Sequence, residues 1–202
     1  MIALKSCCND CPCGVAIIEL LSEEELCRIY NIPIPPQLDL PVSYNIAPSQ
    51  KVLAIRFNPK TGKQSLDTLQ WGLIPHWAKD PKIAYKTINA RVETVDTAPS
   101  YRQAFEKRRC LVPADGFYAW RTIGGVKILF SIGMKDDRPF TFAGLWEGWK
   151  DPATEEWLRT CTIITGDPNE LVAVMYDKRE DSTSKFENGN GESCNSATAT
   201  KK

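Results

Sequence analysis

A run of alternating polar residues in the middle of the chain most constrains how this sequence can fold. Residues 87–94 have the composition of a strand, and the two-residue period of a strand places Asn89, Arg91 and Glu93 on one face. Such a face is too polar to lie in a hydrophobic core. It is therefore either a solvated face of a sheet or the wall of a binding site.

A second strand-like run, residues 109–120, follows after a short helical interval. This run is apolar and aromatic except at Asp115 and Gly116. A glycine inside a strand indicates a bulge, or the close approach of another backbone or a ligand. We therefore expect another group to lie close to Gly116.

The pattern along the rest of the chain predicts one β-rich α+β domain. Ser22 followed by Glu25 is a capping-box pattern and predicts a helix over residues 23–30. The turn-rich residues 58–62 predict a hairpin between their flanking strands. Further strands are expected at residues 15–21, 52–57, 66–74, 127–133, 140–147 and 157–165, and further short helices at 100–107 and 167–175.

The charge balance excludes a strong global attraction to polyanions. Lys plus Arg and Asp plus Glu each number 25 in 202 residues, so any polyanion site must be a local basic patch. No apolar run reaches the roughly 18 residues of a membrane span, and the chain does not start like a secretory signal. We expect a soluble monomer without a membrane partner, cytoplasmic or, in a eukaryote, nuclear.

Four of the eight cysteines crowd the start of the chain, at positions 7, 8, 11 and 13. Cys8 and Cys11 have the spacing of a metal-ligand pair, but a zinc site needs a second pair, and His76 is the only histidine. We interpret the group as clustered thiols and expect neither a metal nor another cofactor. For His76 we expect a role in its loop or in stacking.

The composition changes at about residue 178. Beyond residue 180 the chain is rich in Ser, Thr, Asn, Gly, Glu and Lys, and Phe186 is its only large apolar residue. Such a segment buries too little surface to offset the entropy of ordering it. The composition therefore predicts a disordered polar tail over residues 179–202.

Four motifs stand in order along the chain: Tyr44-Asn45-Ile46-Ala47-Pro48, Trp71-Gly72-Leu73-Ile74-Pro75-x-Trp77, Asn89-Ala90-Arg91-x-Glu93-Thr94 and Cys110-Leu111-Val112-Pro113-Ala114-Asp115-Gly116-Phe117-Tyr118-x-Trp120. This set resembles the SRAP family of SOS-response-associated, abasic-site-processing peptidases. The likeness covers roughly residues 13–177. It implies a mixed, barrel-like fold over residues 13–178, preceded by a leader at residues 1–12.

The resemblance implies that Cys13, followed by Gly14, is catalytic once it becomes the first residue of the chain. An amino-terminal cysteine is a 1,2-aminothiol. Its amine condenses with the aldehyde of an abasic sugar, and its thiol then closes a thiazolidine ring. An internal cysteine offers only its thiol. Self-processing by the family's peptidase activity is the expected route for removing residues 1–12.

Two catalytic positions of the family are changed in this chain. The family has a glutamate before the tryptophan that corresponds to Trp120, whereas this chain has Ala119, and a methyl group moves no proton. By the family's pattern the catalytic histidine falls at Tyr176, and a tyrosine with an ordinary pKa of about 10 is a poor proton shuttle at neutral pH. An arginine that holds phosphate in the family is replaced by Val15.

The DNA-binding positions are retained. Asn89 matches the asparagine that positions the abasic sugar and the catalytic cysteine. Arg91 matches a phosphate-binding arginine, and a guanidinium suits bidentate contact with oxyanions. The family's loops that stack on unpaired bases or wedge a duplex end, together with other positions that line its site, correspond here to Trp71, Pro75, Trp77, Trp120, Pro48 and Thr165. Each tryptophan also suits a core position, Trp71 most of all.

Three hypotheses follow. In the first, the protein binds single-stranded DNA and forms a covalent link to abasic sites through Cys13. In the second, it is a catalytically impaired homologue that binds single-stranded DNA without covalent chemistry. In the third, the cysteine-rich leader binds a metal or a partner, and the domain is a scaffold.

Overall fold

The chain folds mainly as strands that pack around one central core. The structure, a computed structural model, describes residues 16–33, 38, 40–58, 61–123, 125–166 and 197–201. In chain order the described elements are β1 (Ile17–Glu19), α1 (Glu23–Ile29), β2 (Ser43–Ile46), β3 (Lys51–Asn58), β4 (Lys63–Trp71), the 3-10 helix η1 (Pro81–Lys86), β5 (Asn89–Arg91), α2 (Arg102–Lys107), β6 (Arg109–Ala114), β7 (Gly116–Ile123), β8 (Val126–Met134), β9 (Phe140–Lys150), β10 (Trp157–Thr165) and β11 (Ala197–Lys201).

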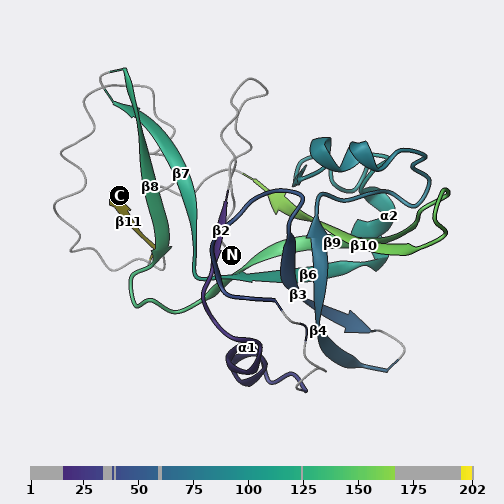
Figure 1. The fold of residues 1–202 in the computed structure, drawn as a ribbon, viewed down its shortest axis with the longest axis horizontal. Helices are drawn as coiled ribbons and strands as arrows, with labels where there is room; N and C mark the ends of the chain where they lie inside the picture. The colour runs from purple at the N-terminus through teal and green to yellow at the C-terminus, as the bar shows by residue number, and fades with distance from the viewer. Residues whose placement is uncertain are drawn as a thin grey trace.

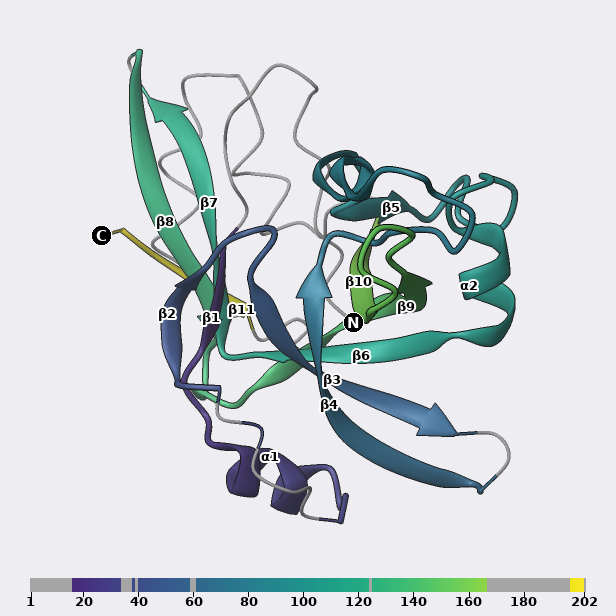
Figure 2. The ribbon, with the colours of Figure 1, turned by 45° about the vertical axis from the view of Figure 1, so that its right-hand side comes forward.

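The strands form two sheets (Figure 1). The larger has the order β4-β3-β6-β9-β10-β5, and β10 also pairs in parallel with β4. This additional pairing closes five strands into a barrel, which confirms the barrel-like α+β fold expected from the sequence. The smaller sheet has the order β11-β8-β7-β1-β2 and stands beside the barrel (Figure 2).

The chain changes from one sheet to the other at Asp115. Ala114 ends β6 and pairs with Phe140 of β9, whereas Gly116 begins β7 and pairs with Gly133 of β8. The single strand predicted over residues 109–120 is therefore two strands in different sheets. The close approach expected at Gly116 is present, because a Cβ atom built on it would lie 2.9 Å from the carbonyl oxygen of Ile132.

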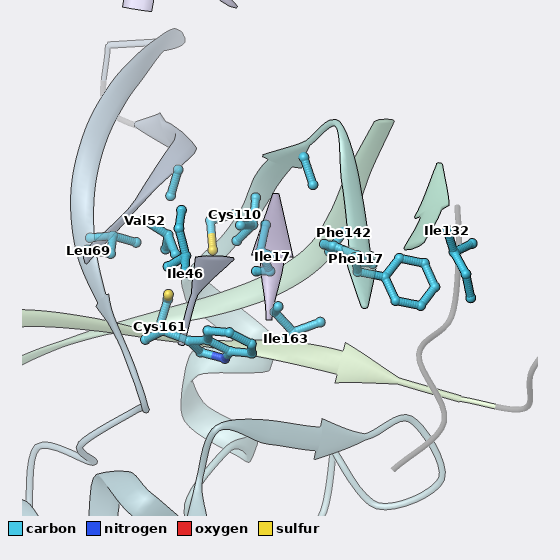
Figure 3. Packing of buried hydrophobic residues seen from close by; sticks show 14 of the residues in the cluster. Ile17, Ile46, Val52, Leu69, Cys110, Phe117, Ile132, Phe142, Cys161 and Ile163 are labelled. Atoms are coloured by element: carbon cyan, nitrogen blue, oxygen red, sulfur yellow. The ribbon is translucent and has the colours of Figure 1, made fainter. Parts of the chain in front are cut away.

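The largest core cluster fills the space between the strands of both sheets (Figure 3). The rings of Phe117, Phe140 and Phe142 meet edge to face with centroids 5.0 to 6.3 Å apart. Cys110 and Cys161 are buried in the same cluster and are free thiols. Edge-to-face ring contacts of this kind add to the stabilisation from apolar burial.

The hairpin and the first helix agree with the sequence predictions. Residues 51–58 of β3 pair in antiparallel register with residues 63–70 of β4. The backbone N–H of Glu25 donates to Ser22 Oγ and the Ser22 N–H donates to the Glu25 carboxylate, so the capping box is complete. Helix α1 covers a second cluster of buried residues, to which it contributes Leu26 and Cys27.

The end of the chain differs from its prediction. All five residues of β11, Ala197–Lys201, pair in antiparallel register with β8, so this part of residues 179–202 is a strand rather than a disordered tail. The reason is that strand pairing uses backbone hydrogen bonds and needs no large apolar side chain, and threonine favours strands. The helix predicted at residues 167–175 lies outside the described residues.

We expect Gly116→Ala to destabilise the fold by about 1–3 kcal/mol, because the added methyl group overlaps the backbone of β8, which cannot move away as a flexible side chain can. Gly148→Ala is the matched control. A Cβ atom at Gly148 makes only ordinary contacts of 3.6 and 3.7 Å with Trp157. Urea unfolding of both variants checks the difference, and equal midpoints would contradict the overlap.

A carboxylate is buried beside the point where the chain changes sheets. Glu19 of β1 is only 4% exposed, and its Oε1 has no hydrogen-bond partner among the described residues. Burial raises the pKa of Glu19 from 4.5 to about 7; a hydrogen bond from the Leu53 backbone opposes this shift, and the negative charge of Asp115 adds to it. The carboxyl group of the folded protein therefore holds its proton up to about neutral pH.

This buried carboxyl group predicts a loss of stability as the pH rises. The folded state binds the proton more tightly than the unfolded chain, so the stabilisation is fully present below pH 4.5 and is lost as the pH rises through about 7. The loss is on the order of 3 kcal/mol. Unfolding free energies measured from pH 4.5 to pH 8 should fall for the wild type relative to Glu19→Gln, and parallel curves would refute this assignment.

Candidate nucleic-acid interface

The polar strand that stood out in the sequence is β5, at the edge of the larger sheet. It pairs in parallel with the end of β10, with Ala90 opposite Ile164 and Arg91 opposite Thr165. Ala90 is buried, Asn89 is half-buried and Arg91 is exposed. Asn89 and Arg91 therefore share a face, as the two-residue period predicted.

The prediction for Glu93 is wrong. Strand β5 ends at Arg91, and residues 92–97 form turns, so the alternation does not continue to Glu93. The backbone N–H of Val92 donates to the carbonyl oxygen of Thr165, 2.8 Å away. After this bond the segment that follows β5 no longer runs along β10. The shared polar face consists of Asn89 and Arg91 alone.

Asn89 is held by its backbone and has a free acceptor on its side chain. The Tyr101 hydroxyl donates to the Asn89 carbonyl oxygen at 3.0 Å. Burial raises the pKa of Tyr101 to about 12, so its hydroxyl stays protonated and remains a donor. The side-chain oxygen of Asn89 is buried and accepts no hydrogen bond within the described part of the chain. Because buried polar atoms are rarely left unpaired, this oxygen is suited to accept a donor from a ligand.

Trp71, a proposed stacking residue, is a core residue instead. It is fully buried, and its indole N–H donates to the carbonyl oxygen of Ile88 at 2.9 Å. The Trp71 backbone exchanges hydrogen bonds with Ser49 and Gln50 at 2.7 and 2.9 Å. No base can reach this ring, but the ring connects the turn after β2 to the segment that leads into β5.

The turn at Trp71 contains Pro48, which is half-buried. Thr165 is buried, and its hydroxyl donates to the Ala90 carbonyl oxygen at 3.3 Å. The structure thus brings Pro48, Asn89, Arg91 and Thr165 to connected positions around Trp71. The sequence alone did not indicate that Trp71 is the connection between them.

Trp77 lies in the loop after β4 and is 50% exposed. Two clefts of about 670 and 650 Å³ meet at its side chain. Arg102 and Arg109 line the first cleft together with Asp96 and Glu106, so its charges balance. The second cleft is lined by Asp80 and by three lysines that were not predicted from the sequence, Lys79, Lys82 and Lys86. Their spacing of three and four residues is the signal that would have revealed them. An exposed indole beside cations suits base stacking and phosphate contact.

The two residues before Trp77 have different surroundings. Pro75 is buried, so it cannot itself contact a base, and its carbonyl oxygen accepts a hydrogen bond from Ala78 within the loop. His76 is about half exposed, and its Nδ1 lies 3.8 Å from the carboxylate of Glu147. This agrees with a role for His76 in the loop.

Ala119 and Trp120 point to opposite faces of β7. Ala119 is 3% exposed and belongs to the central core cluster, and it pairs with Phe130 of β8. Trp120 is 40% exposed and so remains available for contact with a ligand. The backbone N–H of Tyr118 donates to the carbonyl oxygen of Ala16, three residues after Cys13. Ala16, the first described residue, therefore lies beside Tyr118.

For some of the predicted site residues the structure gives no position. Cys13, Val15, Tyr176 and the other leader cysteines lie outside the described residues. Within the described ranges no group of three or more His, Cys, Asp and Glu side chains could hold a metal ion. None of the helices described is long and apolar enough to cross a membrane.

Known proteins are similar to this chain in sequence and in fold. The profile of the family SOS response associated peptidase (SRAP) matches residues 13–180. The "Abasic site processing protein YoqW" of Bacillus subtilis is 46% identical over 162 residues, which cover 79% of this chain and 71% of that protein. The "Abasic site processing protein HMCES" of Gallus gallus is 35% identical over 164 residues, 67% of this chain and 49% of that protein, so the match spans about half of this relative. A crystal structure of a protein from Bacteroides thetaiotaomicron has the same fold, with a TM-score of 0.75 at 24% identity over 92% of this chain and 90% of that one.

Proposed function

Because the chain belongs to the SRAP family, we propose that it processes abasic sites in DNA. The observation that carries this proposal is the pair formed by Asn89 and Arg91 on one face of β5, with a free buried acceptor on the first and an exposed guanidinium on the second. Arg91 would hold a phosphate of single-stranded DNA, and Asn89 would orient the sugar. Two curated relatives whose names state abasic site processing support this assignment.

We assign the covalent step to Cys13 after residues 1–12 are removed by the protein's own peptidase activity. The free amine of Cys13 attacks the aldehyde carbon of the ring-opened abasic sugar, and loss of one water gives an imine. The thiolate then adds to the imine carbon while the nitrogen takes up a proton, which closes a thiazolidine ring. The net change is one water lost, with no oxidant or reductant.

Proton transfer in this step does not come from position 119. Ala119 carries no titratable group, and its neighbours in the core are apolar. Condensation of an aminothiol with an aldehyde needs little acid–base help, so we expect formation of the adduct to continue and to be slower than with a positioned acid.

A second candidate function is binding of single-stranded DNA without covalent chemistry. The observation that favours it is that Arg91 and Trp77 are exposed while Ala119 replaces a proton-transferring residue. The two candidates differ in one respect, because a covalent adduct survives denaturation whereas phosphate contacts weaken steeply with salt.

The first prediction from this proposal concerns mass. We expect the purified protein to begin at Cys13 and to gain the mass of an abasic oligonucleotide less one water, as measured by intact mass spectrometry under denaturing conditions. Cys13→Ser should give no stable adduct, because a hydroxyl group closes the ring far less readily than a thiol. A full-length chain without an adduct would leave only the non-covalent function.

The second prediction concerns Arg91. Arg91→Ala should weaken binding of single-stranded DNA similarly for all base sequences, and the slope of log Kd against log salt should decrease by about 0.7, because one phosphate is no longer neutralised. Arg91→Lys should retain the salt slope, because it keeps the charge, and lose only part of the affinity. Fluorescence anisotropy at several salt concentrations measures both values. An unchanged Kd for Arg91→Ala would remove Arg91 from the site.

A further inference from the structure

A third cleft, of about 650 Å³, lies at the opposite end of β10 from Asn89 and Arg91. Its lining includes Arg108, Glu147, Trp157 and Arg159. Thr165 pairs with Arg91, and Arg159 lies six residues earlier on the same strand, so about 20 Å of strand separates the two places. The β9–β10 hairpin that carries this cleft extends past α2 at the right of Figure 1.

Trp157 forms a flat exposed surface in this cleft. It is 72% exposed, the highest value among the large apolar side chains described. One part of the indole lies against the strand at Gly148, where a built Cβ atom would be 3.6 and 3.7 Å from the ring carbons Cζ3 and Cε3. One edge of the ring therefore rests on β9, and the rest of the indole faces solvent. A supported and exposed indole is a stacking surface for a base.

Arg159 has an incompletely neutralised charge. Its guanidinium lies 3.6 Å from Asp67, and its side chain is 58% exposed. The same carboxylate already accepts hydrogen bonds from Arg56 Nε at 2.8 Å and Ser65 Oγ at 2.6 Å, and Arg56 Nη2 lies 2.7 Å away. Two guanidinium groups thus share one carboxylate, which leaves one positive charge in excess. Arg159 can give its free donors to an anion.

The second arginine of the cleft adds a buried donor. Arg108 pairs with the buried Glu147 at 2.6 Å, so the negative charge of Glu147 is already compensated. The Nε atom of Arg108 is buried and has no partner within the described residues. The Arg108–Glu147 pair therefore adds no net charge, and the cleft combines an aromatic surface with one uncompensated cation, Arg159.

We propose that this cleft binds one nucleotide of the same DNA strand whose abasic site lies at Asn89 and Arg91, with its base on Trp157 and its phosphate on Arg159. This inference rests on the proposed function and deepens it, because it extends the bound DNA along β10. A stacking surface next to a cation fits a nucleotide of any base, so the site would show little sequence preference.

The test measures fluorescence anisotropy with single-stranded oligonucleotides that carry a stable tetrahydrofuran abasic analogue. A short probe of about 3 nucleotides, with the analogue in the middle, reaches only the Arg91 end, and long probes of about 15 nucleotides extend from the analogue on either its 5′ or its 3′ side. We expect Trp157→Ala to weaken binding of one of the two long probes by about 5- to 100-fold and to leave binding of the short probe unchanged. Trp157→Phe should retain most of the affinity, because phenylalanine also stacks.

Arg159→Ala should reduce the salt slope of the same long probe by about 0.7, and Arg159→Lys should restore that slope. Arg138→Ala is the control for removal of an exposed arginine, because Arg138 pairs with Asp136 in the turn between β8 and β9. It should change none of these values. Circular dichroism and urea midpoints check that each variant is folded.

If the wild type binds both long probes and Trp157→Ala leaves its affinity for both unchanged, the subsite is overturned and the proposed function stays intact. If the wild type neither binds any probe nor forms an adduct with an abasic oligonucleotide, the subsite and the proposed function are both overturned. A titration with a mononucleotide distinguishes binding of a DNA strand from binding of free nucleotides at this cleft. If deoxyadenosine monophosphate quenches the fluorescence of wild type but not of Trp157→Phe, and does so as tightly as the long probe binds, the site takes free nucleotides and the strand proposal is wrong.

Discussion

The hydrogen bond from the indole N–H of Trp71 to the carbonyl oxygen of Ile88 is the interaction on which the candidate site depends. The same carbonyl oxygen accepts the backbone N–H of Ile163, so it joins the end of β4 to β10 at the point where the chain enters β5. Because the indole ring is fully buried in a close-packed core, the backbone at the junction of β4, β10 and β5 has little room to move. Asn89 follows directly, which explains how a strand of three residues at a sheet edge can hold a polar side chain in a defined place.

Barrel closure places the other functional groups at the ends of β10. The strand pairs with β9 along its length and with both β4 and β5 in parallel, so its middle is buried. Side chains of β10 that contact a ligand can therefore lie only at the two ends of the strand, outside the buried middle. Thr165 lies at one such end, and Trp157 and Arg159 lie at the other. A single strand of the barrel therefore connects the two places at which we propose that DNA is held.

The overall charge of zero makes local arrangement decisive. Three lysines and a single carboxylate, Asp80, line one cleft at Trp77, and Arg91 and Arg159 are exposed, whereas the carboxylates of Asp67 and Glu147 are paired. Burial raises the pKa of Asp67, but the hydrogen bonds from Arg56 and Ser65 and the charges of Arg56 and Arg159 outweigh it, and the net pKa is lowered. A protein without net charge can in this way present a locally cationic surface to a polyanion.

The sequence by itself determined the fold class, the capping box at Ser22, the β3–β4 hairpin, the family and the shared face of Asn89 and Arg91, because these follow from local periodicity, turn chemistry and motif. Only the tertiary structure decided the rest. It divided the predicted strand at Asp115 between two sheets, ended β5 before Glu93, buried Trp71 while leaving Trp77 exposed, and paired residues 197–201 with β8. Each of these outcomes depends on which distant strand supplies the hydrogen bonds or covers the side chain. Local sequence carries no information about that partner, so burial and pairing could not be read from it.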